Sequence, residues 1–297
     1  MSRIGIHSFV WSASSAQADL ERTLANTKEA GFDLIEFSYL DPLNVDIDRL
    51  ARRIADLNLG VAISIGLPPE GDISSADSAI AARGIEILNR TIALTRDLGG
   101  RKVGGILSSG HGLQSTASTR DQWNRSATTL AEVAERAKAA DVTLNLEIVN
   151  RFESNLLNTT AQGLAFIEDS GSDNIFLHLD TFHMNLEEPD IGLAIRRAAN
   201  KIGYVHLGES HRGFLGTGSI DFAAVFDTLT AIGYKDDLSF ESFSSEIVDE
   251  NLSRKAAIWR NLWTDNMELA RHARRFIALG LETARRKAEL VCAAQKP

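Results

Sequence analysis

Short runs of apolar and β-branched residues alternate with longer amphipathic stretches along the chain. Each short run is typical of a buried parallel strand, and each amphipathic stretch is typical of a helix that covers such a strand. The predicted strands cover residues 4–9, 34–38, 61–65, 103–107, 143–148, 175–180, 203–207 and 238–241. The predicted helices cover residues 16–30, 46–58, 75–98, 120–140, 160–170, 190–200, 221–232 and 252–290. Eight strands that each precede a helix predict an α/β protein with a (β/α)8 barrel.

The chain has 297 residues and no Pro-, Gly- or Ser-rich linker that would separate two domains. A barrel of this kind has about 250 residues. We therefore expect one barrel domain over residues 1–297, with an extended C-terminal helical region at about 252–290. A doubly wound open sheet is the structural alternative. That fold usually carries a phosphate-binding glycine turn after its first strand, where this chain reads HSFVWSASSA.

The composition is that of a globular protein with a net charge of −9. A negative field repels phosphate backbones, which argues against a nucleic-acid partner. No apolar run approaches the roughly 18 residues of a membrane span, so no membrane partner is expected. The N-terminus lacks a signal-peptide pattern, and the single Cys292 has no partner for an internal disulfide. We expect a cytoplasmic protein.

Four candidate chemical groups stand at the ends of the last four predicted strands. LNLEIVNRFE carries Glu147, FLHLDTFHM carries Asp180, YVHLGES carries His206, and LSFESF carries Glu241. Their successive separations are 33, 26 and 35 residues, close to one βα repeat of about 30. Because the carboxyl ends of barrel strands surround one mouth, we expect these four side chains to share a space.

Three carboxylates that lie close together repel one another unless a cation sits among them. Three oxygen ligands with one imidazole suit Mn²⁺, Co²⁺ or Mg²⁺ better than a sulfur-rich zinc site would. The alternative is that each acid is satisfied separately, by a helix N-terminus or a salt bridge. Because all four groups stand at equivalent ends of successive predicted strands, the metal site is the favoured interpretation.

Four segments of the chain resemble one family. EIVNRFE, HLDTFHMN, VHLGESHRG and SFESF are similar to the ketose 3-epimerases, which include D-tagatose, D-allulose (psicose) and L-ribulose 3-epimerases. The opening IGIHSFVWS and the long C-terminal helical region resemble the L-ribulose branch most. The resemblance implies a xylose-isomerase-like barrel. It also implies one Mn²⁺ or Co²⁺ ion per subunit, with Glu147, Asp180, His206 and Glu241 as ligands, and Glu147 and Glu241 as the catalytic acid/base pair.

Epimerisation at C3 of a ketose removes a proton from one face of the carbon and returns one to the other face. It therefore needs two flanking carboxylates, and a metal ion assists by stabilising a cis-enediolate as a Lewis acid. No nucleotide cofactor is expected. The implied function is metal-dependent C3 epimerisation of free ketoses, for which the candidate pairs are L-ribulose/L-xylulose, D-fructose/D-allulose and D-tagatose/D-sorbose.

The resemblance also implies substrate-binding residues. Glu153 is expected near O1 or a metal-bound water, His183 is expected to donate to O2, and Arg212 to hold O1 and O3 as a fixed donor fork. His7 stands where hexose-preferring relatives often carry an aromatic residue, and His111 lies near where some carry a tryptophan. Both are expected at the O4–O6 end of the sugar, although His7 also fits a buried, hydrogen-bonded strand histidine.

Three rival functions remain open. An aldose–ketose isomerase would use the same barrel and metal, and a non-catalytic sugar-binding barrel would keep only the pocket. An apurinic-site endonuclease would need more histidines and a basic groove. Trp259 and Trp263, four residues apart in the predicted C-terminal helix, are expected to pack into the core or a subunit interface. The family resemblance implies a homodimer or homotetramer.

Overall fold

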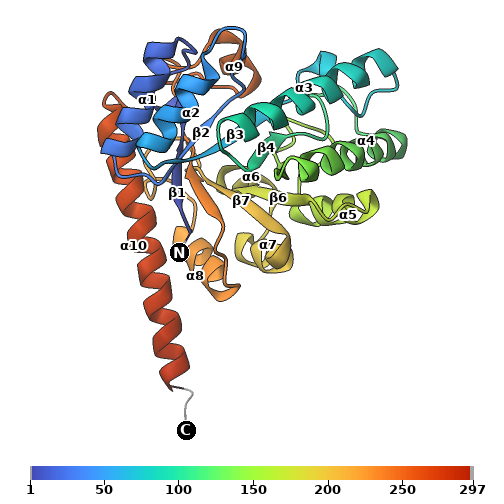
Figure 1. Cartoon of the computed structure of the whole chain (residues 1–297). Coiled ribbons are helices and arrows are strands. Elements are labelled where there is room, and N and C mark those ends of the chain that lie inside the picture. Colours follow the sequence, from blue (N-terminus) through green and yellow to red (C-terminus); the bar gives the residue numbers. More distant parts are fainter. Residues whose placement is uncertain (1, 295–297) are drawn as a thin grey trace.

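The computed structural model describes residues 2–294, and within them eight parallel strands close into a barrel in the order β1 to β8, with β8 pairing back onto β1 (Figure 1). The strands are β1 Ile4–His7, β2 Leu34–Phe37, β3 Gly60–Gly66, β4 Lys102–Ile106, β5 Thr143–Ile148, β6 Ile175–Asp180, β7 Ile202–Leu207 and β8 Asp237–Phe240. The predicted (β/α)8 barrel is therefore confirmed.

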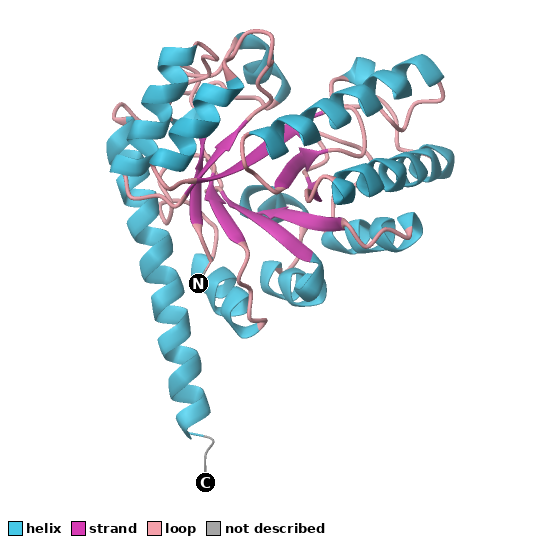
Figure 2. Ribbon diagram, in the orientation of Figure 1, coloured by secondary structure: helices cyan, strands magenta, loops and turns pink. Residues whose placement is uncertain are grey.

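Helices surround the strands on the outside of the barrel (Figure 2). They are α1 Gln17–Glu29, α2 Ile47–Asp56, α3 Ser78–Asp97, α4 Arg120–Ala139, α5 Thr160–Ser170, α6 Thr181–Glu187, α7 Ile191–Ala198, α8 Phe222–Ala231, α9 Glu250–Lys255 and α10 Asn266–Ala294. Several helices begin at a side chain that accepts a backbone N–H, as Asp77 does for α3. Thr119 and Thr159 form full capping boxes at α4 and α5. These caps explain why the helices start where they do.

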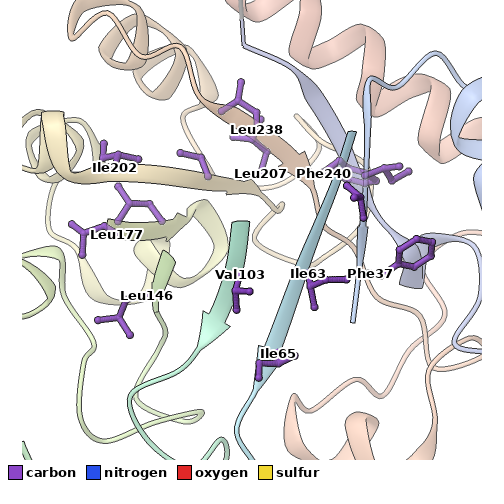
Figure 3. Close-up of a cluster of buried hydrophobic side chains, with 14 of the residues drawn as sticks. Phe37, Ile63, Ile65, Val103, Leu146, Leu177, Ile202, Leu207, Leu238 and Phe240 are labelled. Carbon is purple, nitrogen blue, oxygen red and sulfur yellow. The ribbon is translucent and has the colours of Figure 1, made fainter. Parts of the chain in front are cut away.

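The strands are buried on both faces. Outward-pointing residues such as Ile63, Leu146 and Leu177 pack against the helices (Figure 3), whereas inward-pointing Leu34, Ala62 and Tyr204 form a separate small cluster. Because side chains alternate along a strand, the inward series of each strand continues toward the barrel mouth. On β2 it runs from Leu34 to Glu36, and on β7 from Tyr204 to His206 at the carboxyl end.

The structure differs from the predicted elements in four places. The first strand ends at His7 and passes into a 3-10 turn, Ser8–Val10. Helix α6 was not predicted. It starts directly after β6, where the Asp180 carboxylate accepts the backbone N–H of Phe182 at 2.8 Å. Strand β8 ends at Phe240, so Glu241 is the first residue beyond it.

The fourth difference is at the C-terminus, where residues 256–265 interrupt the predicted helix at 252–290. Trp259 and Trp263 therefore do not lie on one helix, and the prediction of a continuous helix through both is wrong. Trp263 is buried and donates from Nε1 to Asn266 Oδ1 at 2.8 Å, whereas Trp259 is 66% exposed. The long helix α10 runs along the side of the barrel and continues past it (Figure 1). Over residues 2–294, none of the helices combines the length and the apolar character that crossing a bilayer requires.

Candidate active site

A cavity of about 270 Å³ opens at the carboxyl end of the barrel. Its wall includes charged groups from the second half of the chain, among them Glu147, His183, Arg212 and Glu241. It also includes residues of β1, β3, β4, their loops and α9, which are His7, Phe9, Ser64, Gly105, His111 and Leu252. A larger cavity of about 610 Å³ lies at the opposite end of β1, beside α8 and α10, and contains none of the predicted site residues.

The four predicted metal ligands come together at the cavity. Glu147, Asp180, His206 and Glu241 each offer one ligand atom, and these atoms all lie within 4.8 Å of one another. All four residues are buried. Each belongs to the inward series of its strand, at the last inward position of β5, β6 and β7 or directly after β8. The barrel geometry thus produces the cluster that the strand-end spacing predicts.

The donor set fits a divalent cation. His206 Nδ1 is buried without a hydrogen-bond partner, 3.4 Å from Glu241 Oε1 and 3.7 Å from Glu147 Oε1. Asp180 Oδ2 is also buried without an aligned hydrogen bond, although Arg212 Nη1 approaches to 2.9 Å. Buried polar atoms in proteins are nearly always paired. A cation bound by three carboxylate oxygens and an imidazole nitrogen would satisfy both orphaned atoms.

The two predicted acid/base groups have opposite pKa shifts. Burial raises the pKa of Glu147 above its usual range, and repulsion from Glu241 adds to that effect. Burial would also raise the pKa of Glu241, but the charges of His206 and Arg212 outweigh it and hold that pKa well below its usual range. A pair of carboxyls whose pKa values are driven apart is the arrangement that acid/base chemistry uses.

A buried carboxylate that the sequence analysis missed holds the far side of His206. Both oxygens of Glu36 lie within hydrogen-bond distance of His206 Nε2, at 2.8 and 2.9 Å. The Tyr204 hydroxyl donates to Glu36 Oε2 at 2.8 Å. The signal was present in the sequence, since Glu36 is the charged residue of the otherwise apolar LIEF, inside the second predicted strand.

Two predicted substrate-binding residues, His183 and Glu153, meet around a further residue, Asn150. Its backbone N–H and its side-chain amide both donate to His183 Nδ1, at 3.2 and 2.8 Å. This leaves His183 Nε2 as the donor that faces the cluster, 3.7 Å from Glu147 Oε1. The Asn150 amide also donates to Glu153 Oε1 at 3.0 Å. Asn150 lies in the loop after β5 and was not predicted as a site residue.

Glu153 joins His111 to this network, with 3.1 Å between Glu153 Oε2 and His111 Nε2. Burial would raise the pKa of Glu153, but the neighbouring charge of His183 and the hydrogen bond from His111 lower it to about 2. Glu153 is therefore ionised at neutral pH. Its position places a negative charge on the cavity wall beside the metal-ligand cluster.

Arg212 has an unusual backbone and a crowded guanidinium. Its φ of +61° is in the left-handed region, and Nη1 lies 2.6 Å from Glu241 Oε2. The guanidinium carbon lies 3.9 Å from the ring centre of Phe182 and 5.1 Å from that of Phe243. Burial would lower the Arg212 pKa, but Asp180 and Glu241 raise it. The planar group is fixed between aromatic faces with its nitrogens toward the cluster.

His7 is a buried, hydrogen-bonded strand histidine that also lines the cavity. It is buried, Nδ1 accepts the backbone N–H of Phe9 at 3.2 Å, and Nε2 lies 3.4 Å from Ser64 Oγ. It also lines the cavity, as does His111. Burial lowers the His7 pKa. The ring therefore presents a neutral edge to the cavity.

Comparison with known proteins agrees with this geometry. The Xylose isomerase-like TIM barrel family matches residues 24–278. The chain is 82% identical to an L-ribulose 3-epimerase of Mesorhizobium japonicum (strain LMG 29417 / CECT 9101 / MAFF 303099), over all of both chains. It is 42% identical over 275 residues to a ketose 3-epimerase of Arthrobacter globiformis, covering 93% of this chain and 95% of that protein.

Two solved structures are similar over nearly the whole chain. An L-ribulose 3-epimerase structure has a TM-score of 0.98 and 84% identity, and the match covers both chains completely. A D-allulose 3-epimerase from Methylomonas sp., in complex with D-allulose, has a TM-score of 0.91 and 39% identity, covering 94% of this chain and 96% of that one. The expected resemblance is confirmed. The protein is thus an enzyme of the Xylose isomerase-like TIM barrel family and belongs, within it, to the ketose 3-epimerases.

Proposed function

We propose that the protein is a metal-dependent 3-epimerase of free ketoses. The candidate substrate pairs are L-ribulose/L-xylulose, D-fructose/D-allulose and D-tagatose/D-sorbose. One observation carries the proposal: Glu147 and Glu241, from β5 and from the end of β8, face one cavity and approach the same His206 nitrogen. The 82% identity to an L-ribulose 3-epimerase supports the pentose pair.

Glu147, Asp180, His206 and Glu241 would hold one Mn²⁺ or Co²⁺ ion per subunit, and the orphaned Asp180 and His206 atoms support this assignment. Such an ion would supply Lewis-acid stabilisation of the negative charge that develops on the sugar oxygens. The reaction moves protons only, so we propose no nucleotide cofactor.

In the proposed reaction, one of the two carboxylates takes the C3 proton from one face of the sugar. The other carboxyl group delivers a proton to the opposite face of the resulting cis-enediolate. The roles exchange when the opposite epimer is the substrate.

The neighbouring residues would orient the sugar. His183 would donate from Nε2 to O2, because Asn150 occupies Nδ1; Arg212 Nη2 lies 3.5 Å from the same Nε2. Arg212 would hold O1 and O3 from its fixed guanidinium, and Glu153 would accept a hydrogen bond near O1 or from a metal-bound water. His7 and His111, which also line the cavity, would contact the O4–O6 end.

We further propose that the chain forms one barrel domain with a C-terminal helical extension, and that it assembles as a homodimer or homotetramer. Leu279, Leu290 and Val291 on α10 and Trp259 before it are large apolar side chains exposed on the isolated chain, which supports assembly. Light scattering coupled to size-exclusion chromatography would measure the number of subunits. A monomer over the micromolar range would contradict the assembly.

The test of the reaction uses metal-loaded protein in D₂O with L-ribulose, D-fructose or D-tagatose, and an EDTA-treated sample as control. Proton NMR follows deuterium entry at each carbon. Exchange at C3 with formation of the 3-epimer, abolished by EDTA, is the expected result. Aldose formation without exchange at C3 would assign the enzyme to the aldose–ketose isomerases. Saturable sugar binding with no exchange at any carbon would assign a non-catalytic sugar-binding barrel.

A further inference from the structure

Glu36 is a buried acid that the proposed reaction does not use. It is fully buried on the inner face of β2. In the described part of the chain its ion pair is with His206 alone, so no lysine or arginine compensates its charge. Removing a carboxylate from water without a full partner is costly. A buried carboxylate of this kind is therefore expected where its negative charge serves another group.

The hydrogen bonds of Glu36 converge on the far nitrogen of His206. Nε2 lies 2.8 and 2.9 Å from the two carboxylate oxygens, so it carries a proton and donates it. The opposite nitrogen, Nδ1, faces Glu147 and Glu241 and has no hydrogen-bond partner. An imidazole that binds a metal through one nitrogen can keep a proton on the other. The Glu36 contact therefore fixes which nitrogen is available to a cation.

Two neighbours keep this contact in place. The Tyr204 hydroxyl donates to Glu36 Oε2 at 2.8 Å, which fixes the carboxylate. The His206 ring packs edge-on against His178, with 4.0 Å between ring centres, and against Tyr204 at 5.5 Å. The ring therefore has little room to turn. Packing therefore limits the space around the ring. The hydrogen bond to Glu36 determines which ring nitrogen carries the proton and in which direction the ring points.

We propose that Glu36 is a positioning residue of the metal centre. It holds His206 with Nε2 protonated and Nδ1 directed at the cation, and Tyr204 holds Glu36. Carboxylates of this kind raise the basicity of a ligating histidine and fix its orientation. The inference rests on the metal centre of the proposed function. Glu36 itself touches neither the cation nor the sugar.

The test measures binding of Mn²⁺ alone to metal-free protein by titration calorimetry. In Glu36→Gln the neutral amide can turn its NH₂ toward Nε2, which would place the ring proton on Nδ1 and block it. Mn²⁺ binding is expected to weaken about 10- to 100-fold. The visible absorption of the Co²⁺-loaded variant is expected to shift, because the ligand field at the imidazole changes. Tyr204→Phe keeps the carboxylate and is expected to show a smaller loss.

Asp237→Asn is the matched control. Asp237 is also a buried barrel carboxylate, but it pairs with Arg3 at the other end of β8. This variant is expected to lose thermal stability while its Mn²⁺ affinity stays within about twofold of wild type. A merely structural role for Glu36 would give Glu36→Gln the same behaviour, and that result would overturn the proposal.

Each remaining outcome also supports or contradicts either the role of Glu36 or the metal centre itself. If Glu36→Gln does not fold, Tyr204→Phe carries the test: weaker Mn²⁺ binding supports the proposal, and unchanged binding overturns it. If the wild-type protein binds no Mn²⁺, the metal centre of the proposed function fails. Unchanged binding in a folded Glu36→Gln variant, with normal binding in wild type, overturns only the role of Glu36.

Discussion

The guanidinium of Arg212 donates a hydrogen bond of 2.6 Å from Nη1 to Oε2 of Glu241. The same nitrogen lies 2.9 Å from Asp180 Oδ2, so one cation contacts two members of the carboxylate cluster. The face of the guanidinium rests on Phe182 at 3.9 Å. Charge, planarity and stacking all contribute here, and a lysine ammonium would keep only the charge.

Arg212→Lys is therefore expected to lower kcat/KM for L-ribulose about 10- to 100-fold while the fold is retained. Arg120→Lys is the matched control, because Arg120 also pairs with an acid, Asp169, and stacks near Trp123, but on the exposed surface of α4. Steady-state kinetics of both variants check the prediction. Equal activity of the two would contradict a specific role for the Arg212 guanidinium.

Glu147→Gln and Glu241→Gln are each expected to lower kcat by about 10³-fold or more, because each removes one proposed proton carrier that is also a proposed cation ligand. Deuterium exchange at C3, followed by proton NMR, measures the loss. Glu168→Gln, on the exposed face of α5, serves as control and should match wild type. Full activity in either site variant would rule out the two-carboxylate mechanism.

The pKa of Glu153 predicts a pH-dependent contribution to stability. Its folded-state pKa is about 2, below the roughly 4.3 of an unfolded glutamate. The ionised carboxylate therefore stabilises the folded state above about pH 4.3, and this contribution is lost as the pH falls toward 2. At neutral pH it amounts to at most about 3 kcal/mol.

Urea unfolding of metal-free wild type and Glu153→Gln, from about pH 7 down to about pH 3, measures this contribution. Wild type is expected to be the more stable protein at pH 7, and the difference should shrink as the pH falls. A difference that stays constant across this range would show that Glu153 contributes through its shape and hydrogen bonds and not through its charge.

The two C-terminal tryptophans are expected to respond differently to truncation. Trp263 is 6% exposed, so Trp263→Ala should cost about 3–5 kcal/mol in the free energy of unfolding. Trp259 is 66% exposed, so Trp259→Ala should stay within about 0.5 kcal/mol of wild type. Chemical denaturation at a protein concentration where the chain is monomeric checks both values. Similar costs for the two would contradict the packing described for residues 256–265.

The barrel and the four-residue cluster were predictable because both follow from a repeat. Parallel strands that recur at nearly constant spacing end at one mouth, so the last inward residue of each strand is brought to the same place. Glu147, Asp180 and His206 occupy those positions, and Glu241 follows β8 directly. The prediction needed only the register of each strand and no knowledge of side-chain contacts.

Contacts across the barrel were not predictable in the same way. Glu36 and His206 are separated by 170 residues, and they meet only because barrel closure places β2 across from β7. No glycine or proline marks the break after α9 in the sequence. Instead Ala257 adopts the left-handed conformation there, with φ of +53°. That position at a helix end usually belongs to glycine. The periodic apolar pattern therefore predicted one helix where the structure has two.

Two sets of residues build the cavity wall. The carboxylates and histidine of the cluster come from β5, β6, β7 and the position after β8, while His7, Phe9, Ser64 and Leu252 come from β1, the 3-10 turn after it, β3 and α9. Selection for a different sugar can therefore act on one set of codons while the set that encodes the chemistry is inherited unchanged. A combinatorial library limited to those four wall positions would diversify sugar preference within one conserved reaction.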